Sequence, residues 1–311
     1  MPEPRNRQWD YAVYLLARLG VAIVQALPVG LAYCLAGLIG DILYRLVGTH
    51  RKRALAHLRL SFPDWSADRC RRVAKASARN LVYLALEVLL TTRKISPSSW
   101  RRHVRLKDMA PMIRLLVQRP SGLILVTGHF GNWEVAGYMT AAIGLPTLTI
   151  ARYIKNPYLN GYVNAVRERA GQRMVEKSGA AAEVEAAMAR RDAVSVVFDQ
   201  DAGRKGIFVD FFGRPASTFK SVGLMAMLYQ APVAVVYCRR LDRAYRFEVT
   251  GQRVIHPHEW ADKDDPLQWI TQEYTAALEQ VVRTDPAQYF WVHRRWKHRP
   301  PGQPPPPGGI G

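Results

Sequence analysis

The chain has 311 residues, of which 49% are apolar, so it can bury a full core and is not globally disordered. Lys and Arg outnumber Asp and Glu by 44 to 25, and the formal net charge of +19 favours anionic partners: phospholipid head groups, phosphorylated glycolipids, nucleic acid or an acidic carrier protein. The three cysteines are scattered, without the spacing of a disulfide framework or a structural zinc site.

The first predicted element is a membrane-associated helix. Residues 19–40 carry no formal charge, and this run is long enough to cross the hydrocarbon core as a helix. Pro28 would kink a continuous helix, so the segment either spans the membrane or is half-inserted. The alternative is a buried core helix. Basic residues are denser after the run than before it, which places the body of the protein on the cytoplasmic face of the inner (cytoplasmic) membrane.

Beyond this segment, helical and strand patterns alternate. A long helix is predicted over 68–91. Strands are predicted over 122–127, 146–151, 193–199 and 232–239, with an edge strand over 245–250. Helices are predicted over 133–143, 157–170, 181–191, 218–230 and 266–283. This alternation predicts an α/β fold with a largely parallel sheet covered by helices on both faces. The chain then divides into a membrane-associated segment (1–48), an α/β domain (49–299) and a disordered Pro/Gly-rich tail (300–311).

The most informative segment is VTGHFGNWE, Val126–Glu134. A buried strand ends at Thr127, two glycines turn the chain, and a helix begins near Asn132, a good N-cap residue. His129 therefore lies at the carboxyl end of a strand, where open α/β sheets place their sites.

The spacing of His129 and Glu134 predicts a catalytic pair. Residues five apart on a continuous helix point away from each other, so the two meet only if a loop holds His129 and the first helical turn holds Glu134. A carboxylate on one ring nitrogen fixes the tautomer and leaves the other nitrogen as a general base. This base could deprotonate a hydroxyl that attacks an acyl carbonyl. The alternative is a structural histidine beside a carboxylate that only favours the helix start.

At these residues the chain resembles the bacterial lipid A biosynthesis (late) acyltransferases of the lysophospholipid acyltransferase superfamily. That family carries an H-x4-D/E motif in the form HFGNWE, which this sequence has unchanged from His129 to Glu134. Four further segments resemble family motifs in the expected order, and they cover most of the chain: HRKRALAHLRLSFPD (50–64), ARYIKNP (151–157), FDQDAGRKGIFVDFFGRPASTFKS (198–221) and WVHRRWKHRP (291–300). Tyr153 departs from the pattern, because a proline often stands there in the family.

The resemblance implies that His129 is the base and that Glu134 orients it. It also implies substrate-binding residues, namely Arg152, Asn156, Asp199 and Asn132. The guanidinium of Arg152 suits a phosphate or the thioester donor. For Asp199, which directly follows a buried strand, the alternative is a turn or N-cap residue.

The resulting prediction is an acyltransferase that moves a fatty acyl chain from acyl carrier protein or coenzyme A to a hydroxyl of lipid A or a related glycolipid. No metal or cofactor is expected beyond the acyl thioester co-substrate, and no G-x-S-x-G motif indicates a covalent acyl-enzyme. The expected partners are the donor, the glycolipid acceptor and membrane phospholipids. Alternatives are another acceptor such as a phosphatidylinositol mannoside, thioester hydrolysis, or a non-catalytic basic protein that binds membranes or nucleic acid.

The basic aromatic segment 291–300 bears on the last of these alternatives. Such a patch could anchor the protein to a membrane surface or stack nucleic acid bases. The apolar N-terminal run argues against nucleic acid.

Overall fold

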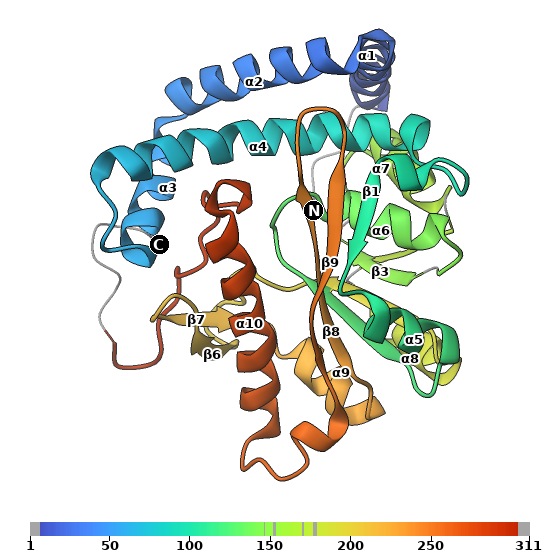
Figure 1. Ribbon diagram of the computed structural model, residues 1–311, viewed down its shortest axis with the longest axis vertical. Coiled ribbons are helices and arrows are strands. Elements are labelled where there is room, and N and C mark those ends of the chain that lie inside the picture. The colour runs from blue at the N-terminus through green and yellow to red at the C-terminus, as the bar shows by residue number, and fades with distance from the viewer. Residues whose placement is uncertain (1–6, 146, 152–153, 170, 177–178, 304–311) are drawn as a thin grey trace.

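The protein folds around one seven-stranded sheet. A computed structural model describes residues 7–145, 147–151, 154–169, 171–176 and 179–303. The strands of the sheet lie in the order β1-β9-β8-β2-β5-β3-β4 (Figure 1). Their bounds are β1 Val104–Lys107, β2 Leu123–Thr127, β3 Thr147–Ala151, β4 Arg173–Glu176, β5 Ala193–Val197, β8 Val233–Arg240 and β9 Phe247–Ile255. All neighbouring strands run parallel except β8 and β9. The predicted α/β class and largely parallel sheet are confirmed.

The predicted edge strand at 245–250 is the exception. It belongs to β9, which lies inside the sheet between β8 and β1. The two edges of the sheet are β1 and β4, and the sequence analysis predicted neither. The four residues of β1, VRLK, alternate two basic side chains with two apolar ones, and this pattern is too short to stand out as a strand.

Helices cover both faces of the sheet because successive residues of each central strand point to opposite sides. Ile124 and Val126 of β2 face one core, which α8 (Ala180–Ala189), α9 (Ser221–Tyr229) and α10 (Pro266–Thr284) complete. Leu123 faces the other core, which α5 (Ala110–Gln118) and α6 (Trp133–Ala142) complete. α7 (Pro157–Glu168) connects β3 to β4.

The N-terminal apolar run forms two helices rather than one. α1 (Arg7–Ala26) ends just before Pro28, and α2 (Val29–Leu46) begins just after it. A short helix, α3 (Gly48–Ser61), leads to the long α4 (Ala67–Lys94), along which α2 lies (Figure 1). Among the described residues, α2 is the one helix long and apolar enough to cross a membrane.

The basic aromatic segment 291–300 packs into the interior of the protein. Trp291 and Trp296 are buried, and the guanidinium of Arg295, 1% exposed, donates hydrogen bonds to Ser217 and Thr218. Those two residues belong to a two-stranded antiparallel unit, β6 (Ile207–Asp210) with β7 (Pro215–Thr218). Because both indole rings are buried, this segment cannot present them to nucleic acid bases. The described residues also include three short 3-10 helices: Trp100–Arg102, Pro257–Glu259 and Pro286–Gln288.

Candidate active site

His129 lies in a tight turn between β2 and α6. The backbone amide of Gly131 donates to Gln288, and that of Asn132 donates to the carbonyl of Cys238, so the turn is fixed from two sides. Gly131 has φ +59°, and a Cβ at this position would lie 1.9 Å from the carbonyl oxygen of Cys238. No side chain fits there, which explains the glycine in the motif.

Asp199 holds the His129 ring. Nδ1 of His129 lies 2.6 Å from Oδ1 of Asp199, and the backbone amide of His129 donates to Oδ2 at 2.9 Å. Asp199 is the second residue after β5, which pairs with β2, so the carboxyl ends of two neighbouring strands bring His129 and Asp199 together. Burial alone would raise the pKa of Asp199, but the charge of His129 and these hydrogen bonds lower that pKa well below its ordinary value. The Asp199 carboxylate therefore stays ionised and keeps Nδ1 as the donor.

Glu134 lies elsewhere than the sequence predicted. Both of its oxygens accept hydrogen bonds from the Arg167 guanidinium, at 2.8 and 2.5 Å, in a two-pronged ion pair between α6 and α7. The carboxylate on the His129 ring is Asp199, where the prediction had Glu134. The first turn of α6 directs Glu134 toward α7, so the H-x4-E spacing does not produce a local pair in this structure.

Asn132 is fully buried and supports the turn. Its side-chain oxygen accepts from the amide of Val135 as an N-cap, and its side-chain nitrogen donates to Glu87 at 2.8 Å. Glu87, on α4, is itself fully buried and also accepts hydrogen bonds from Tyr33 of α2 and Arg240 of β8. The predicted substrate contact of Asn132 would require one of these groups to be released.

Asn156 also acts as an N-cap. Its side-chain oxygen accepts from the amides of Tyr158 and Leu159 at the start of α7, and its nitrogen donates to the carbonyl of Asp10 in α1. The side chain is buried and ties α1 to the domain. Arg152, the fourth predicted substrate-binding residue, lies outside the described residues, and its role stays a prediction.

Two residues that the sequence did not single out flank the His129 ring. Nε2 of His129 lies 3.3 Å from the side-chain nitrogen of Gln200, the residue after Asp199. The Trp133 ring packs edge-on against the imidazole, with the centroids 4.7 Å apart. Gln200 could have been predicted from its place after Asp199 in the motif FDQD, because neighbouring residues at a strand end reach the same rim of the sheet.

His129 opens into a large cavity of about 740 Å³. Glu134, Arg167, Trp133 and Gln200 also line it. Most of the remaining wall is apolar, including Leu125, Val126, Val184, Leu224 and Leu228. A histidine on the wall of a largely apolar cavity suits chemistry on a group that carries a hydrocarbon chain.

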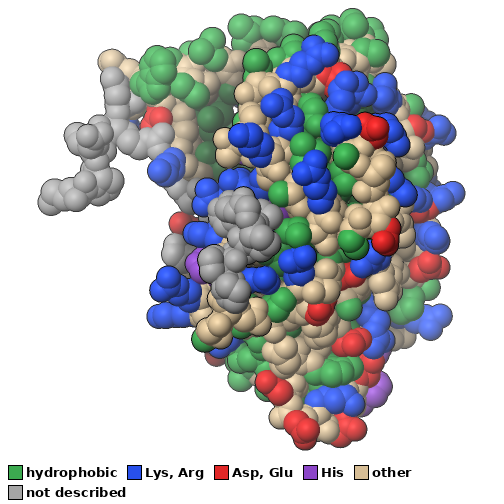
Figure 2. Space-filling model, turned by 90° about the vertical axis from the view of Figure 1, so that its left-hand side faces the viewer, with side chains coloured by type: hydrophobic (Ala, Val, Ile, Leu, Met, Phe, Trp, Pro, Cys, Tyr) green, Lys and Arg blue, Asp and Glu red, His purple; other side chains and the backbone are tan. Residues whose placement is uncertain are grey.

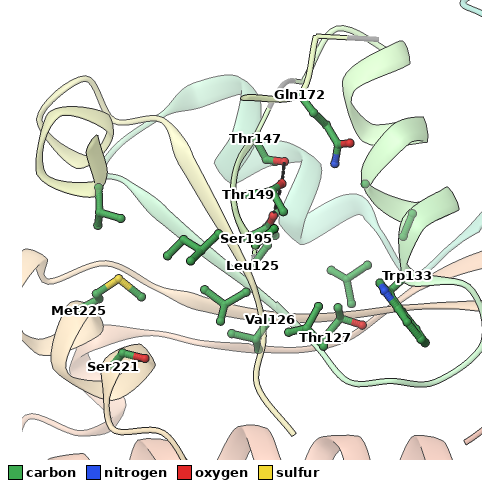
Figure 3. A pocket seen from close by; sticks show the side chains of 18 of the residues that line it. Leu125, Val126, Thr127, Trp133, Thr147, Thr149, Gln172, Ser195, Ser221 and Met225 are labelled. Atoms are coloured by element: carbon green, nitrogen blue, oxygen red, sulfur yellow. Dashed lines mark hydrogen bonds between the residues drawn. The ribbon is translucent and has the colours of Figure 1, made fainter. Parts of the chain in front are cut away.

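The cavity is lined from both faces of the sheet because β3 and β5 separate. Their pairing ends at Thr149 and Ser195, whereas β2–β5 and β3–β4 continue to the strand ends. Beyond that point, Ile150 and Val196 line the cavity on the α8 and α9 side. Thr149 and Ser195 line it on the α6 side. Figure 3 shows Thr149 and Ser195 side by side, with Met225 of α9 across the strands from Trp133.

Comparison with known proteins gives one consistent result. The family model described as bacterial lipid A biosynthesis acyltransferase matches residues 3–298. The lipid A biosynthesis lauroyltransferase of Escherichia coli (strain K12) is 24% identical over 302 residues, which cover 94% of each chain. The palmitoleoyltransferase of the same organism is 25% identical over 308 residues, 96% of each chain. Its myristoyltransferase is 23% identical over 303 residues, 96% of this chain and 90% of that protein.

Proposed function

Because this chain belongs to the bacterial lipid A biosynthesis acyltransferase family, we propose that it transfers a fatty acyl chain from an acyl thioester to a hydroxyl of lipid A or a related glycolipid. The observation that carries the proposal is His129, fixed by Asp199 on the wall of the largely apolar cavity. The cavity gives the acyl chain a place to bind, and the histidine gives the acceptor hydroxyl a base.

In the proposed reaction, Nε2 of His129 takes the proton of the acceptor hydroxyl as its oxygen attacks the thioester carbonyl. The ionised Asp199 stabilises the imidazolium that forms. The tetrahedral intermediate then collapses, the carbon–sulfur bond breaks, and the imidazolium returns its proton to the leaving thiolate. Gln200, 3.3 Å from Nε2, lies where it can hydrogen-bond the acceptor hydroxyl. Glu134 shapes the site through Arg167.

The donor in this proposal is acyl carrier protein, with coenzyme A thioesters second. The net charge of +19 favours an acidic carrier, because opposite charges raise the rate of encounter. We propose Arg152 as the residue that binds a substrate phosphate. Arg152→Lys keeps the charge but loses the planar fork, so it should recover only a minor part of the activity that Arg152→Ala removes. Near-normal kinetics in both variants would remove Arg152 from the site.

We propose that α1 and α2 attach the enzyme to the inner membrane, with the α/β domain on the cytoplasmic side. Large apolar side chains of α2 are exposed, including Leu38 at 58% and Leu46 at 77%. Figure 2 shows apolar side chains along the top of the molecule and many Lys and Arg side chains below them. Because the opposite side of α2 packs on α4, whose first turns carry several charged residues, a helix lying in the membrane interface fits better than one that crosses the bilayer.

The direct test is transfer from a radiolabelled lauroyl thioester to a lipid A precursor that lacks late acyl chains. His129→Ala should reduce turnover at least ~10²-fold, the typical contribution of a positioned general base. Phe290→Leu, a change of a neighbouring ring without a proton to transfer, is the matched control. Wild-type turnover in a folded His129→Ala protein would contradict the mechanism.

A further inference from the structure

The α6 side of the cavity carries a row of hydroxyls that a saturated hydrocarbon chain does not need. Oγ1 of Thr149 lies 2.8 Å from Oγ of Ser195, and Oγ1 of Thr147 lies 3.5 Å from that of Thr149. All three residues line the cavity. Figure 3 shows the three hydroxyls in succession, joined by dashed lines. We refer to Thr147, Thr149, Ser195 and Gln172 together as the polar wall.

Gln172 is the strongest sign that the polar wall binds a ligand. Its side chain is 7% exposed and lines the cavity, and among the described residues it has no hydrogen-bond partner. The amide points into the space in front of α6 (Figure 3). A Cβ at Gly137 would lie 2.2 Å from the Gln172 nitrogen, so the glycine leaves room for this amide. Because the amide faces the cavity, a hydroxyl of a bound ligand could both donate to it and accept from it.

The two sides of the cavity therefore differ in chemistry. Toward α8 and α9 the wall is aliphatic, with Val126, Ile150 and Leu224. Toward α6 it offers hydroxyls that donate and accept and an amide that does both. The three hydroxyls bond to one another, but an unsubstituted chain packed against the polar wall would give the Gln172 amide no group to bond with.

The depth of the polar wall decides which part of a chain it meets. Ser195 is level with Leu125, four residues before His129, and Thr147 is level with Leu123, six residues before it. Because β2 ends at Thr127 and His129 lies in the turn beyond, the distance from Leu125 to His129 is at most roughly 13 Å at about 3.3 Å per residue, and Thr147 lies deeper. An extended lauroyl chain is of comparable length. The polar wall therefore meets the far end of a chain whose carbonyl lies at His129, and it is too distant for an oxygen near the thioester.

We propose that this enzyme accepts acyl chains that carry a hydroxyl near the end remote from the thioester, and that Gln172 recognises that hydroxyl. The inference rests on the proposed acyl transfer and names its substrate class. Thr147 lines the cavity and is 2% exposed, so this part of the wall is shielded from bulk solvent. A shielded wall suits a chain terminus, whereas the pantetheine arm of the donor must continue to its carrier. The three relatives are named for lauroyl, palmitoleoyl and myristoyl groups, so a hydroxylated chain would set this enzyme apart from those names.

The test uses the full-length enzyme in detergent, the same lipid A precursor and three acyl groups, each supplied as a thioester of acyl carrier protein, the proposed donor. They are lauroyl, β-hydroxylauroyl and ω-hydroxylauroyl. We expect kcat/KM for the ω-hydroxy chain to exceed that for lauroyl by ~10-fold or more, since a site that hydrogen-bonds a hydroxyl discriminates against the analogue without it. The β-hydroxy chain should behave like lauroyl, because its hydroxyl does not reach the polar wall.

Variants assign the preference to the polar wall. Gln172→Leu should reduce the ω-hydroxy preference to about twofold or less, and Ser195→Ala should reduce the preference in part. Thr140→Val is the matched control. Thr140 lines the same cavity, but its hydroxyl already donates to the carbonyl of Ala136, so its loss should leave the preference intact.

Equal or poorer transfer of the ω-hydroxy chain by the wild type would overturn the inference and leave the acyltransferase proposal standing. A preference that survives Gln172→Leu and Ser195→Ala would also overturn it. If none of the three thioesters acylates the precursor, the proposed function itself fails, and the inference fails with it.

Discussion

His129 and Asp199 are 70 positions apart in the chain, yet their side chains form the central hydrogen bond of the site. The sequence placed a carboxylate on the imidazole and identified both residues, but it assigned the contact to Glu134, the nearer carboxylate. Strand pairing decides the matter. β2 and β5 are neighbours in the sheet, and this adjacency is a property of topology that a local motif does not contain.

The hydrogen bond between His129 and Asp199 predicts that the stability of the protein falls in acid. Because the folded-state pKa of Asp199 is lowered, its contribution to stability is complete above the unfolded pKa of about 4 and is lost as pH falls below that value. Thermal melts of the wild type should therefore decline between pH 5 and pH 3 more steeply than those of Asp199→Asn. Parallel declines in the two proteins would show that the His129–Asp199 pair contributes no pH-dependent stability.

Glu134 should act through Arg167 rather than through the histidine. Removing either partner leaves a partly buried charge unpaired, so Glu134→Gln and Arg167→Gln should each impair transfer. The double variant should lose little more than the worse single variant, which gives a coupling free energy of about 1–3 kcal/mol in a double-mutant cycle. A second double-mutant cycle, with Glu134→Gln and Asp199→Asn, serves as the comparison. Strong coupling in that second cycle, with none in the first, would restore Glu134 as the partner of His129.

At the scale of elements, α2 and α4 approach each other through small residues. Ala32, Ala36, Gly37 and Gly40 are the buried small residues of α2, and they recur on one face of the helix. A Cβ at Gly40 would lie 2.6 Å from the backbone Cα of Arg79. The glycine therefore allows the two backbones to pack closely, while the leucine and isoleucine side chains of α2 remain on the outside.

The close packing of α2 on α4 leads to opposite expectations for two glycines. Gly40→Ala forces the helices apart and should destabilise the protein by about 1–3 kcal/mol. Gly20→Ala in α1, where a Cβ would meet nothing within 4 Å, should be neutral or stabilising by up to about 1 kcal/mol, because alanine favours a helix. Thermal unfolding in detergent checks both changes. If the two variants melt alike, this close packing does not contribute to stability.

Long periodic elements were predictable and short ones were not. The helix over 68–91 and the central strands emerge from apolar periodicity, which tertiary contacts only reinforce. β1, β6 and β7 have four residues each, and their identity depends on the strands they pair with. The N-terminal run was recognised as one apolar segment, but only the structure shows that Pro28 divides it fully into two helices.

At the scale of the whole molecule, the sequence predicted the rim on which His129 and Asp199 meet but not the cavity beside it. The carboxyl-end rule placed His129 and Asp199 on one rim. The cavity depends on β3 and β5 separating after Thr149 and Ser195, and on the inward direction of side chains from both faces of the sheet. Gln172 joins that wall from a short loop before β4, a position that no local pattern marks as functional.

The hydrogen bond from Tyr33 to Glu87 governs how this enzyme can be prepared without detergent. Truncation after residue 48 would remove the apolar N-terminal helices. It would also remove the Tyr33 hydroxyl that donates to the fully buried Glu87, the carboxylate that binds Asn132 at the start of α6. The loss of this hydrogen bond would destabilise the turn that contains His129. A cut at Pro28, between the helices, removes α1 but keeps α2 and with it Tyr33. The exposed apolar face of α2 then remains, and we expect polar substitutions on that face to give a water-soluble and active protein.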